Sequence, residues 1–436
     1  MALVLDASTR NWTDLKHRLQ TRPTEIHVIT RRALALLVTL FSHFNETGED
    51  RGRNLFTDVN KLVIGEKDSP SSVRSPVKKI SPTDLGKIVS YLPGLKEITI
   101  QNISFSPTSG EREEVLMIPN PPRDLSLLAL QCSFHMLAEV PGTSRPMTQD
   151  CEQAFELYRV LRLFRTIDHL FLNVHGPCPS FPDSEPWLDM IDGLRLESPK
   201  IPLDVLDLAM VHADAGALDI LRRGGCTSEL RCITYRPTPH CSDHIGAFQR
   251  LLDSSPKLSH FMALPYKCLD GEPVQMITPM YPRFDLSKCP RLREIHFRAR
   301  YNIGRITQRF HQDYITAWME TLRPLGTCLP HLRRVTLEFS INLVQGVQPR
   351  LTVGEILRDI FSTETHKILY EIMDNTLVEL CRDSLEAVVF GVVVIGNLSY
   401  EREVWETSGA KQLVQRLMPR MTRRGKLSWA LSRVTE

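Results

Sequence analysis

The stretch LPGLKEITI at residues 92–100 recurs as CPRLREIHF at 289–297 and as LPHLRRVTL at 329–337. In each copy a proline precedes a short run in which apolar and polar residues alternate. Proline disfavours a helical conformation in the residue before it, and alternation at every second residue is typical of a β-strand. The three copies therefore predict three equivalent strands, each of which follows a helix.

The same frame, Leu-x-x-apolar-x-apolar, occurs ten times along the chain. Side chains alternate between the two faces of a strand, so the fourth and sixth positions are expected in the core and the fifth on the opposite face. The first, fourth and sixth positions are Val59/Leu62/Ile64, Leu95/Ile98/Ile100, Leu125/Leu128/Leu130, Ile167/Leu170/Leu172, Leu203/Leu206/Leu208, Leu230/Ile233/Tyr235, Leu258/Phe261/Ala263, Leu292/Ile295/Phe297, Leu332/Val335/Leu337 and Leu385/Val388/Phe390.

Amphipathic segments precede most of these strands, and successive frames lie 27 to 53 residues apart. That spacing accommodates one helix, one strand and two turns, and a helix that returns the chain to the same sheet edge makes the strands parallel. We therefore expect an α/β repeat solenoid with strands on its concave face and helices on its convex face. A plain α/β sandwich with several buried strands is the alternative. The predicted helices are 85–92, 151–164, 244–254, 313–325 and 366–381, the first with Ser81 as its N-cap and Pro82 in its first turn.

Composition indicates a soluble globular protein without a strong overall charge. The 436 residues carry a formal net charge of +2, and the ten cysteines contain no CxxC pair, which favours free thiols in a reducing compartment. The N-terminus lacks a secretory pattern, and the apolar run 33–41 is too short to cross a bilayer. We expect a buried helix at 33–41, no transmembrane segment, and a cytoplasmic or nuclear location.

Three regions are predicted. Residues 1–50 are expected to form a helical N-terminal cap, and 51–398 the repeat region with a flexible Ser/Pro-rich insertion at 68–80. Residues 399–436 are expected to form a basic C-terminal cap or tail. Within the insertion, Ser75 is a candidate for proline-directed phosphorylation, and a merely solvated loop is the alternative. The basic tail could also bind an anionic surface such as nucleic acid or lipid.

The phrases YLPGLKEITI, SSPKLSHF, CPRLREIHF and CLPHLRRVTL resemble the irregular leucine-rich repeats of fungal F-box-type proteins, over about residues 55 to 395. The resemblance implies an irregular leucine-rich-repeat-like solenoid that holds a substrate protein and attaches to the adaptor of a cullin-type ubiquitin ligase. An F-box opening of the form L-P-x-E-(I/L)-L does not occur in the first 60 residues.

The fifth positions of the frames form the candidate protein-binding row on the concave face. A slip of one residue in the frame would bury this row instead. Its candidate residues are Thr99, Phe171, Asp207, Thr234, Met262, His296 and Thr336, with Val63, Ala129 and Val389 in the same positions of other frames.

No catalytic motif of the Gly-x-Ser-x-Gly, His-Glu-x-x-His, Walker or dinucleotide type occurs, and no cofactor or small-molecule substrate is expected. The segment His240–His244 with Cys226 and Cys232 matches no established zinc spacing, so no metal is expected. We predict a monomeric, non-enzymatic protein that binds another protein. A scaffold without a ligase link and an anionic-surface binder are the alternatives.

Overall fold

A computed structural model describes the chain in two compact units, Met1–Leu230 with Gly246–Leu251, and Arg231–Ile245 with Leu252–Glu436. In both units the described strands are parallel and helices lie between them along the chain, so the predicted α/β class is confirmed. The described residues are 2–6, 22–47, 56–65, 79–105, 123–133, 157, 159–175, 204–212, 215–236, 242–264, 283–302, 308–327, 329–342, 364–380, 385–395 and 409–431.

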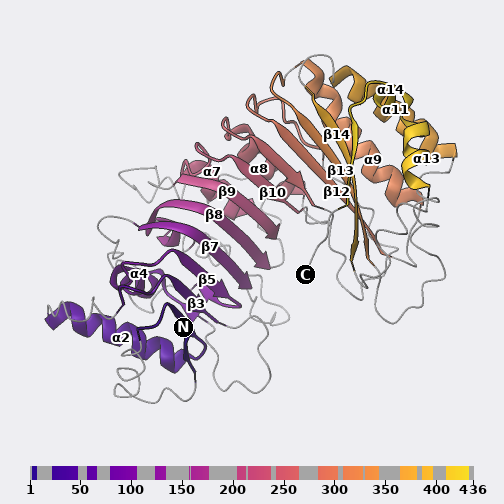
Figure 1. Ribbon diagram of the computed structural model, residues 1–436. Helices are drawn as coiled ribbons and strands as arrows, with labels where there is room; N and C mark the ends of the chain where they lie inside the picture. The colour runs from indigo at the N-terminus through magenta and orange to yellow at the C-terminus, as the bar shows by residue number, and fades with distance from the viewer. Residues whose placement is uncertain are drawn as a thin grey trace, which may run out of the picture. The chain divides into compact units, whose positions relative to one another are not determined.

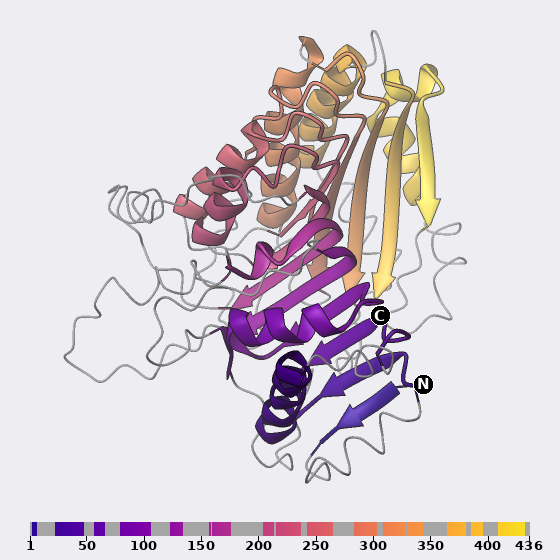
Figure 2. The ribbon, with the colours of Figure 1, turned by 90° about the vertical axis from the view of Figure 1, so that its left-hand side faces the viewer.

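The first unit contains a sheet whose strand order follows the chain, β1-β2-β3-β5-β7-β8-β9. Figure 2 shows α2 (Arg31–Thr47) and α4 (Pro82–Tyr91) side by side against this sheet, and the rings of Phe41 and Tyr91 stack between them at 5.0 Å. The unit also contains α7 (Ala215–Arg223) and a small pair of parallel strands, β4 (Lys79–Ile80) and β6 (Ser104–Phe105). The main strands are β1 Ala2–Leu5, β2 Glu25–Val28, β3 Lys61–Ile64, β5 Glu97–Gln101, β7 Arg123–Ser133, β8 Phe164–His175 and β9 Asp204–His212.

The second unit repeats this plan with the strand order β10-β11-β12-β13-β14-β15. Its strands are β10 Cys232–Tyr235, β11 His260–Ala263, β12 Glu294–Asn302, β13 Arg334–Asn342, β14 Ala387–Ile395 and β15 Leu427–Leu431. Its helices are α9 Gln308–Leu322, the 3-10 helix η2 Arg323–Thr327, α11 Glu364–Leu380, α13 Ala410–Leu417 and α14 Pro419–Arg423. Helix α8 spans Ser242–Asp253, and its residues Gly246–Leu251 belong to the first unit.

The frame positions form buried ladders across neighbouring strands of the first unit. Leu3, Ile26, Leu62, Ile98, Leu128 and Leu170 are register partners in one ladder, and Leu5, Val28, Ile64, Ile100, Leu130 and Leu172 in the next. All twelve side chains are buried. Each strand is too short to bury an apolar face alone, so stacking equivalent residues builds the core.

The corresponding ladders of the second unit are richer in aromatic residues. Ile233, Phe261, Ile295, Val335 and Val388 form one ladder, and Tyr235, Ala263, Phe297, Leu337 and Phe390 the next. All are buried, and Trp318 of α9 stacks on Phe297 with ring centroids 5.7 Å apart and contacts Phe339 at 5.7 Å. The predicted core positions are therefore confirmed for these frames.

The frame at β9 is two residues out of register. Phe171 pairs with Ala209, whereas Asp207 pairs with His169, so Asp207 does not occupy the predicted row position. Leu206, Leu208 and Met210 alternate with the same period, and a slip of two residues preserves the period while it changes every strand partner. Strand pairing, rather than the local pattern, decides the register here.

The helices at the predicted ranges 85–92, 244–254, 313–325 and 366–381 are confirmed by α4, α8, α9 and α11. The Oγ of Ser81 accepts a hydrogen bond from the backbone N–H of Asp84 at 3.0 Å, and Pro82 lies in the first turn, as predicted. The apolar run 33–41 lies within α2. The described part of residues 1–50 is not purely helical, because β1 and β2 add two strands to the sheet besides α2.

The basic C-terminal segment is folded onto the second unit. Strand β15 pairs with β14, and Val414, Met418 and Met421 are buried. Asp374 of α11 accepts hydrogen bonds from the backbone N–H groups of Arg420 and Met421, both at 2.9 Å, and so caps α14 from a distant part of the chain. These contacts are typical of the cap that we predicted as one of two alternatives for this segment.

Some predictions concern residues that the structure does not describe. Ser75, most of the 68–80 insertion, half of the predicted 151–164 helix and His240 lie outside the described residues. Within the described residues, none of the helices is long and apolar enough to span a bilayer. Cys226 and Cys289 are buried and take part in no disulfide bond.

Candidate functional site: a polar strand face

Four of the predicted residues lie on adjacent strands of the second unit. Thr234 of β10 pairs with Met262 of β11, which pairs with His296 of β12, which pairs with Thr336 of β13. We call these four residues the strand-face row. All four are half-buried rather than buried, so the alternative of a one-residue slip, which would place them in the core, does not apply to these strands.

Helices pack on the opposite face of the same strands. Figure 1 shows α9, α11, α13 and α14 on one side of β12, β13 and β14. Phe297 and Phe339 point to this side, since both contact Trp318 of α9. His296 and Arg298 alternate with Phe297 along β12 and therefore belong to the other face. Among the described residues, this other face of β12 and β13 carries the polar side chains.

A buried carboxylate lies beside the strand-face row. Glu338 of β13 has a side chain only 3% exposed, and it forms ion pairs with Arg298 and, at 3.1 Å, with Nε2 of His296 in its protonated form. Burial alone would raise the pKa of Glu338, but the pairing with His296 and Arg298 outweighs it and holds the pKa below its ordinary value. The charge of Glu338 is thus balanced within the sheet by residues of the neighbouring strand.

The strand on the other side of Glu338 provides space for this side chain. Gly391 of β14 is its register partner, and a Cβ at Gly391 would lie 3.2 Å from Cγ of Glu338. A larger residue at 391 would therefore push against the carboxylate side chain. Arg298, Glu338 and Gly391 form one register row, two residues further along the strands than His296, Thr336 and Val389.

Charged residues also lie on the other side of the strand-face row. His260 of β11 is 3.7 Å from Glu294 of β12, and both side chains are about half exposed. Arg334 of β13 is the next register partner of Glu294 and is exposed. The row of half-buried Thr, Met and His side chains is therefore bordered by ionic groups, an arrangement that suits contact with another macromolecule better than a closed, water-excluding pocket.

The predicted residues of the first unit form a similar but less complete row. Thr99 of β5 pairs with Ala129 of β7, and Ala129 pairs with Phe171 of β8. Thr99 and Phe171 are half-buried, while Ala129 is buried. Ala209 continues this row in place of the predicted Asp207.

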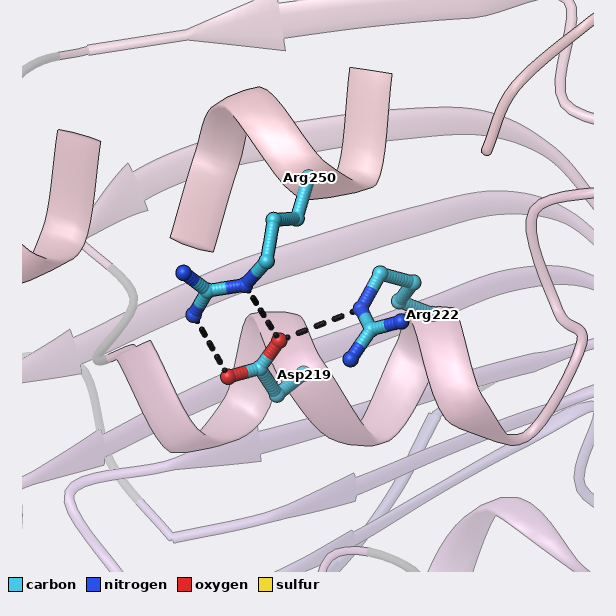
Figure 3. Close-up of polar contacts among 3 residues, drawn as sticks. All are labelled: Asp219, Arg222 and Arg250. Atoms are coloured by element: carbon cyan, nitrogen blue, oxygen red, sulfur yellow. Dashed lines mark hydrogen bonds and ion pairs between the residues drawn. The ribbon is translucent and has the colours of Figure 1, made fainter. Parts of the chain in front are cut away.

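A second buried carboxylate lies on a helix of the first unit rather than on a strand of the second unit. Asp219 of α7 has a side chain 6% exposed and contacts two guanidinium groups, as Figure 3 shows. Arg250 of α8 approaches through Nη2 at 2.9 Å and Nε at 3.4 Å, and Arg222 through Nε at 3.2 Å. Because this cluster joins one helix to another on the first unit, we interpret it as a stabilising contact between helices.

The sequence did not single out Arg298 and Glu338. The signal was present, because EIHFRAR and RVTLEFS alternate apolar and polar residues beyond the sixth frame position. Extending the period-two pattern by two residues would have placed both side chains on the face of His296 and Thr336. Their pairing depends on the register of β12 with β13, which the pattern alone does not specify.

The residues described by the structure include no group of three or more His, Cys, Asp or Glu that could hold a metal ion. A scan against protein-family models gave no match to this chain. No curated protein matches its sequence significantly either.

Proposed function

We propose that this chain is an irregular leucine-rich-repeat-like solenoid that binds another protein through its strand face, without a catalytic role. The strand-face row carries this proposal. It places the half-buried Met262 and His296 between two threonines on four adjacent strands, bordered by ionic groups. Protein-binding surfaces combine a few large side chains with polar neighbours in this way.

The solenoid itself is supported by strand order and register. In each unit the strands follow one another in chain order and the frame residues stack in ladders. Both features are expected when each repeat contacts mainly its neighbours. The resemblance to fungal F-box-type proteins adds a more specific role, in which the bound protein is a substrate of a cullin-type ubiquitin ligase.

The test is affinity purification of the full chain from its native cells, followed by mass spectrometry. We compare the wild type with Met262→Asp, which places a charge in the strand-face row. The control is Ile368→Asp on α11, whose side chain is 62% exposed on a helix. We expect a specific partner with the wild type and the control and its loss with Met262→Asp, with thermal unfolding verifying that both variants fold.

Two results would refine or reject this proposal. Co-purification of a cullin and its adaptor would support the ligase role, whereas a specific partner without these components would support a scaffold. If folded Met262→Asp retains every partner of the wild type, the strand face is not the binding surface. Deleting residues 411–436 would not test whether the basic tail binds an anionic surface, because the deletion would also remove β15 from the sheet.

A further inference from the structure

The edge at which the strands of the second unit begin is strongly basic. Parallel strands all start at one edge of their sheet, so the residues that lead into them gather there. We define the entry edge as residues 231–232, 257–260, 291–294, 331–334, 385–387 and 424–427. It contains eight Lys or Arg residues, Arg231, Lys257, Arg291, Arg293, Arg333, Arg334, Arg424 and Lys426, against two acids, Glu294 and Glu386.

Backbone hydrogen bonds hold consecutive members of this edge next to one another. The carbonyl of Arg231 accepts from the N–H of Ser259 at 2.8 Å, that of Ser259 from Arg293 at 2.8 Å, and that of Arg293 from Arg333 at 2.8 Å. Each link crosses one strand, so Arg231 and Arg333 are about 14 Å apart at the usual spacing of strands. The cationic side chains are thus attached to a regular backbone.

Four of the six arginines of the entry edge form no ion pair with another described residue. Arg231, Arg291, Arg293 and Arg334 are exposed and have no ion-pair partner among the described residues. Arg333, in contrast, lies 3.7 Å from Glu386. Like charges at this spacing repel one another, and the two acids of the edge, Glu294 and Glu386, offset only part of the charge of its eight basic residues. An anionic group from outside the chain would offset the remainder.

The surroundings favour carboxylates of a polypeptide over a phosphate polymer or a lipid surface. The large apolar side chains that are exposed in the described part of the chain are Val4, Ile368 and Ile372, and none belongs to the entry edge. The edge therefore lacks an exposed Phe, Tyr or Trp on which bases stack and an apolar anchor for a bilayer. Glu294 and Glu386 interrupt the basic residues, and a polypeptide can place uncharged residues opposite them, whereas a continuous row of phosphates cannot.

We propose that the entry edge of the second unit binds an acidic polypeptide segment of the protein partner. Guanidinium groups pair with carboxylates through two parallel hydrogen bonds, which favours Arg over Lys at such a site. Arg334 lies two residues before Thr336 on the same face of β13, so a segment at the edge can continue onto the strand-face row. This inference rests on the proposed function and adds the chemistry of the partner.

The experiment uses the full chain and a fluorescein-labelled peptide rich in Glu and Asp. A peptide of about ten residues extends over about 33 Å, which is longer than the distance of about 14 Å between Arg231 and Arg333. Fluorescence anisotropy measures its affinity for the wild type and for the triple variant Arg231→Glu, Arg293→Glu and Arg334→Glu. We expect binding to the wild type that weakens with added salt. The triple variant should bind at least about tenfold more weakly, because three charge contacts become repulsive.

The matched control makes the same change in net charge elsewhere, with Arg31→Glu, Lys96→Glu and Lys411→Glu, all at exposed positions. Its affinity should stay within about twofold of the wild type if binding is local to the edge. Should the triple Glu variant fail to fold, the triple Ser variant at Arg231, Arg293 and Arg334 removes the charge without reversing it, and it should also lose binding.

Three outcomes overturn the inference. They are no binding of the peptide to the wild type, an equal loss in the control variant, and tighter binding of single-stranded DNA or phosphatidylserine vesicles than of the peptide. A failure of the proposed function can be told apart from a failure of this inference. The proposed function is tested with Met262→Asp, whereas the inference is tested with the arginine variants. Peptide binding at the edge together with full partner recovery by Met262→Asp would reject the strand-face row and support the edge.

Discussion

The entry columns of the two units have the same backbone geometry and different side chains. In the first unit the carbonyl of Thr24 accepts from Asn60 at 2.9 Å, that of Asn60 from Lys96 at 2.8 Å, and that of Lys96 from Ser126 at 2.8 Å. In the second unit the corresponding column is Arg231, Ser259, Arg293 and Arg333. One column is mainly neutral and the other mainly basic.

This difference shows that the fold requires the backbone hydrogen bonds of the columns but not particular side chains. The links between strands are made by N–H and C=O groups, which every residue other than proline supplies. The side chain at each entry position is therefore not specified by the fold. The second column carries three arginines and the first column carries none, a difference that is better explained by contact with a partner than by stability.

The cores of the two units differ as well, and Trp318→Ala should have the largest effect. Trp318 is fully buried and contacts both Phe297 and Phe339, whereas the ladders of the first unit consist of aliphatic residues. Removing the indole leaves a large cavity, so we expect a loss of about 3–5 kcal/mol in the free energy of unfolding of the second unit. Denaturant unfolding monitored by circular dichroism measures it.

Hydrogen exchange shows whether this effect is confined to one unit. Protection should fall in β12 and β13 and remain in β3 and β5. A uniform loss across all four strands would mean that the two units unfold together, and the comparison between them would then concern surface chemistry alone.

Glu338→Gln tests the buried ionic cluster on the strand face of the second unit. The ion pairs described on the strand face of the first unit, His27 with Glu25 and Lys61 with Glu97, are each about one-third exposed or more. The substitution leaves His296 and Arg298 without their buried anion, and we expect the second unit to lose about 3 kcal/mol of stability at neutral pH. The control is Glu294→Gln, whose side chain is about half exposed and should cost less than about 0.5 kcal/mol.

The pH dependence of Glu338 has a definite sign. Its pKa is lower in the folded chain than in the unfolded chain, so its stabilising contribution is present at neutral pH and is lost as the pH falls through the folded value. The difference in stability between the wild type and Glu338→Gln should therefore shrink in acid. A difference that stays constant from neutral pH to about pH 3 would contradict the ion-pair interpretation.

Asp374→Ala tests the cap at the C-terminal end of the second unit. Loss of its two hydrogen bonds to the N-terminus of α14 should cost about 1 kcal/mol. Hydrogen exchange should increase first in α14 and β15, while β12 stays protected. Glu371→Ala, at an exposed position of the same helix, is the control and should leave these rates unchanged.

The sequence predicted most of the core because the frame is a local pattern. Leu95, Leu258, Leu292 and Leu332 are buried at the first positions, and the strands that follow them lie where the alternation indicates. The strand at β2 was missed although EIHV at 25–28 resembles EITI at 97–100 and EIHF at 294–297. The first frame position before β2 is Pro23 rather than Leu, Ile or Val, so the search frame excluded it.

Long-range pairing was beyond the local pattern. The register of Asp207, the contact of Glu338 with His296 and the capping of α14 by Asp374 each join segments that the sequence separates by tens of residues. A period-two pattern is unchanged by a shift of two residues, and a cap supplied from another helix leaves no motif near the helix that it caps.

Exchanging the entry column should have the smallest effect on stability. The triple variant Arg231→Thr, Arg293→Asn and Arg333→Ser gives the second unit the types of residue found in the first. The links between strands use backbone groups, and the one ion pair lost, between Arg333 and Glu386, is exposed. We therefore expect the free energy of unfolding to change by less than about 0.5 kcal/mol.

The same variant should lose affinity for the acidic peptide, since it removes from the edge two arginines, Arg231 and Arg293, that form no ion pair with any described residue. If the variant keeps its stability and loses its affinity for the peptide, the arginines serve binding and the backbone alone holds the strands together. A loss of more than about 2 kcal/mol in stability, a value typical of buried rather than surface substitutions, would instead show that the basic column is needed for folding. The difference between the entry-column side chains of the two units would then be a requirement of folding.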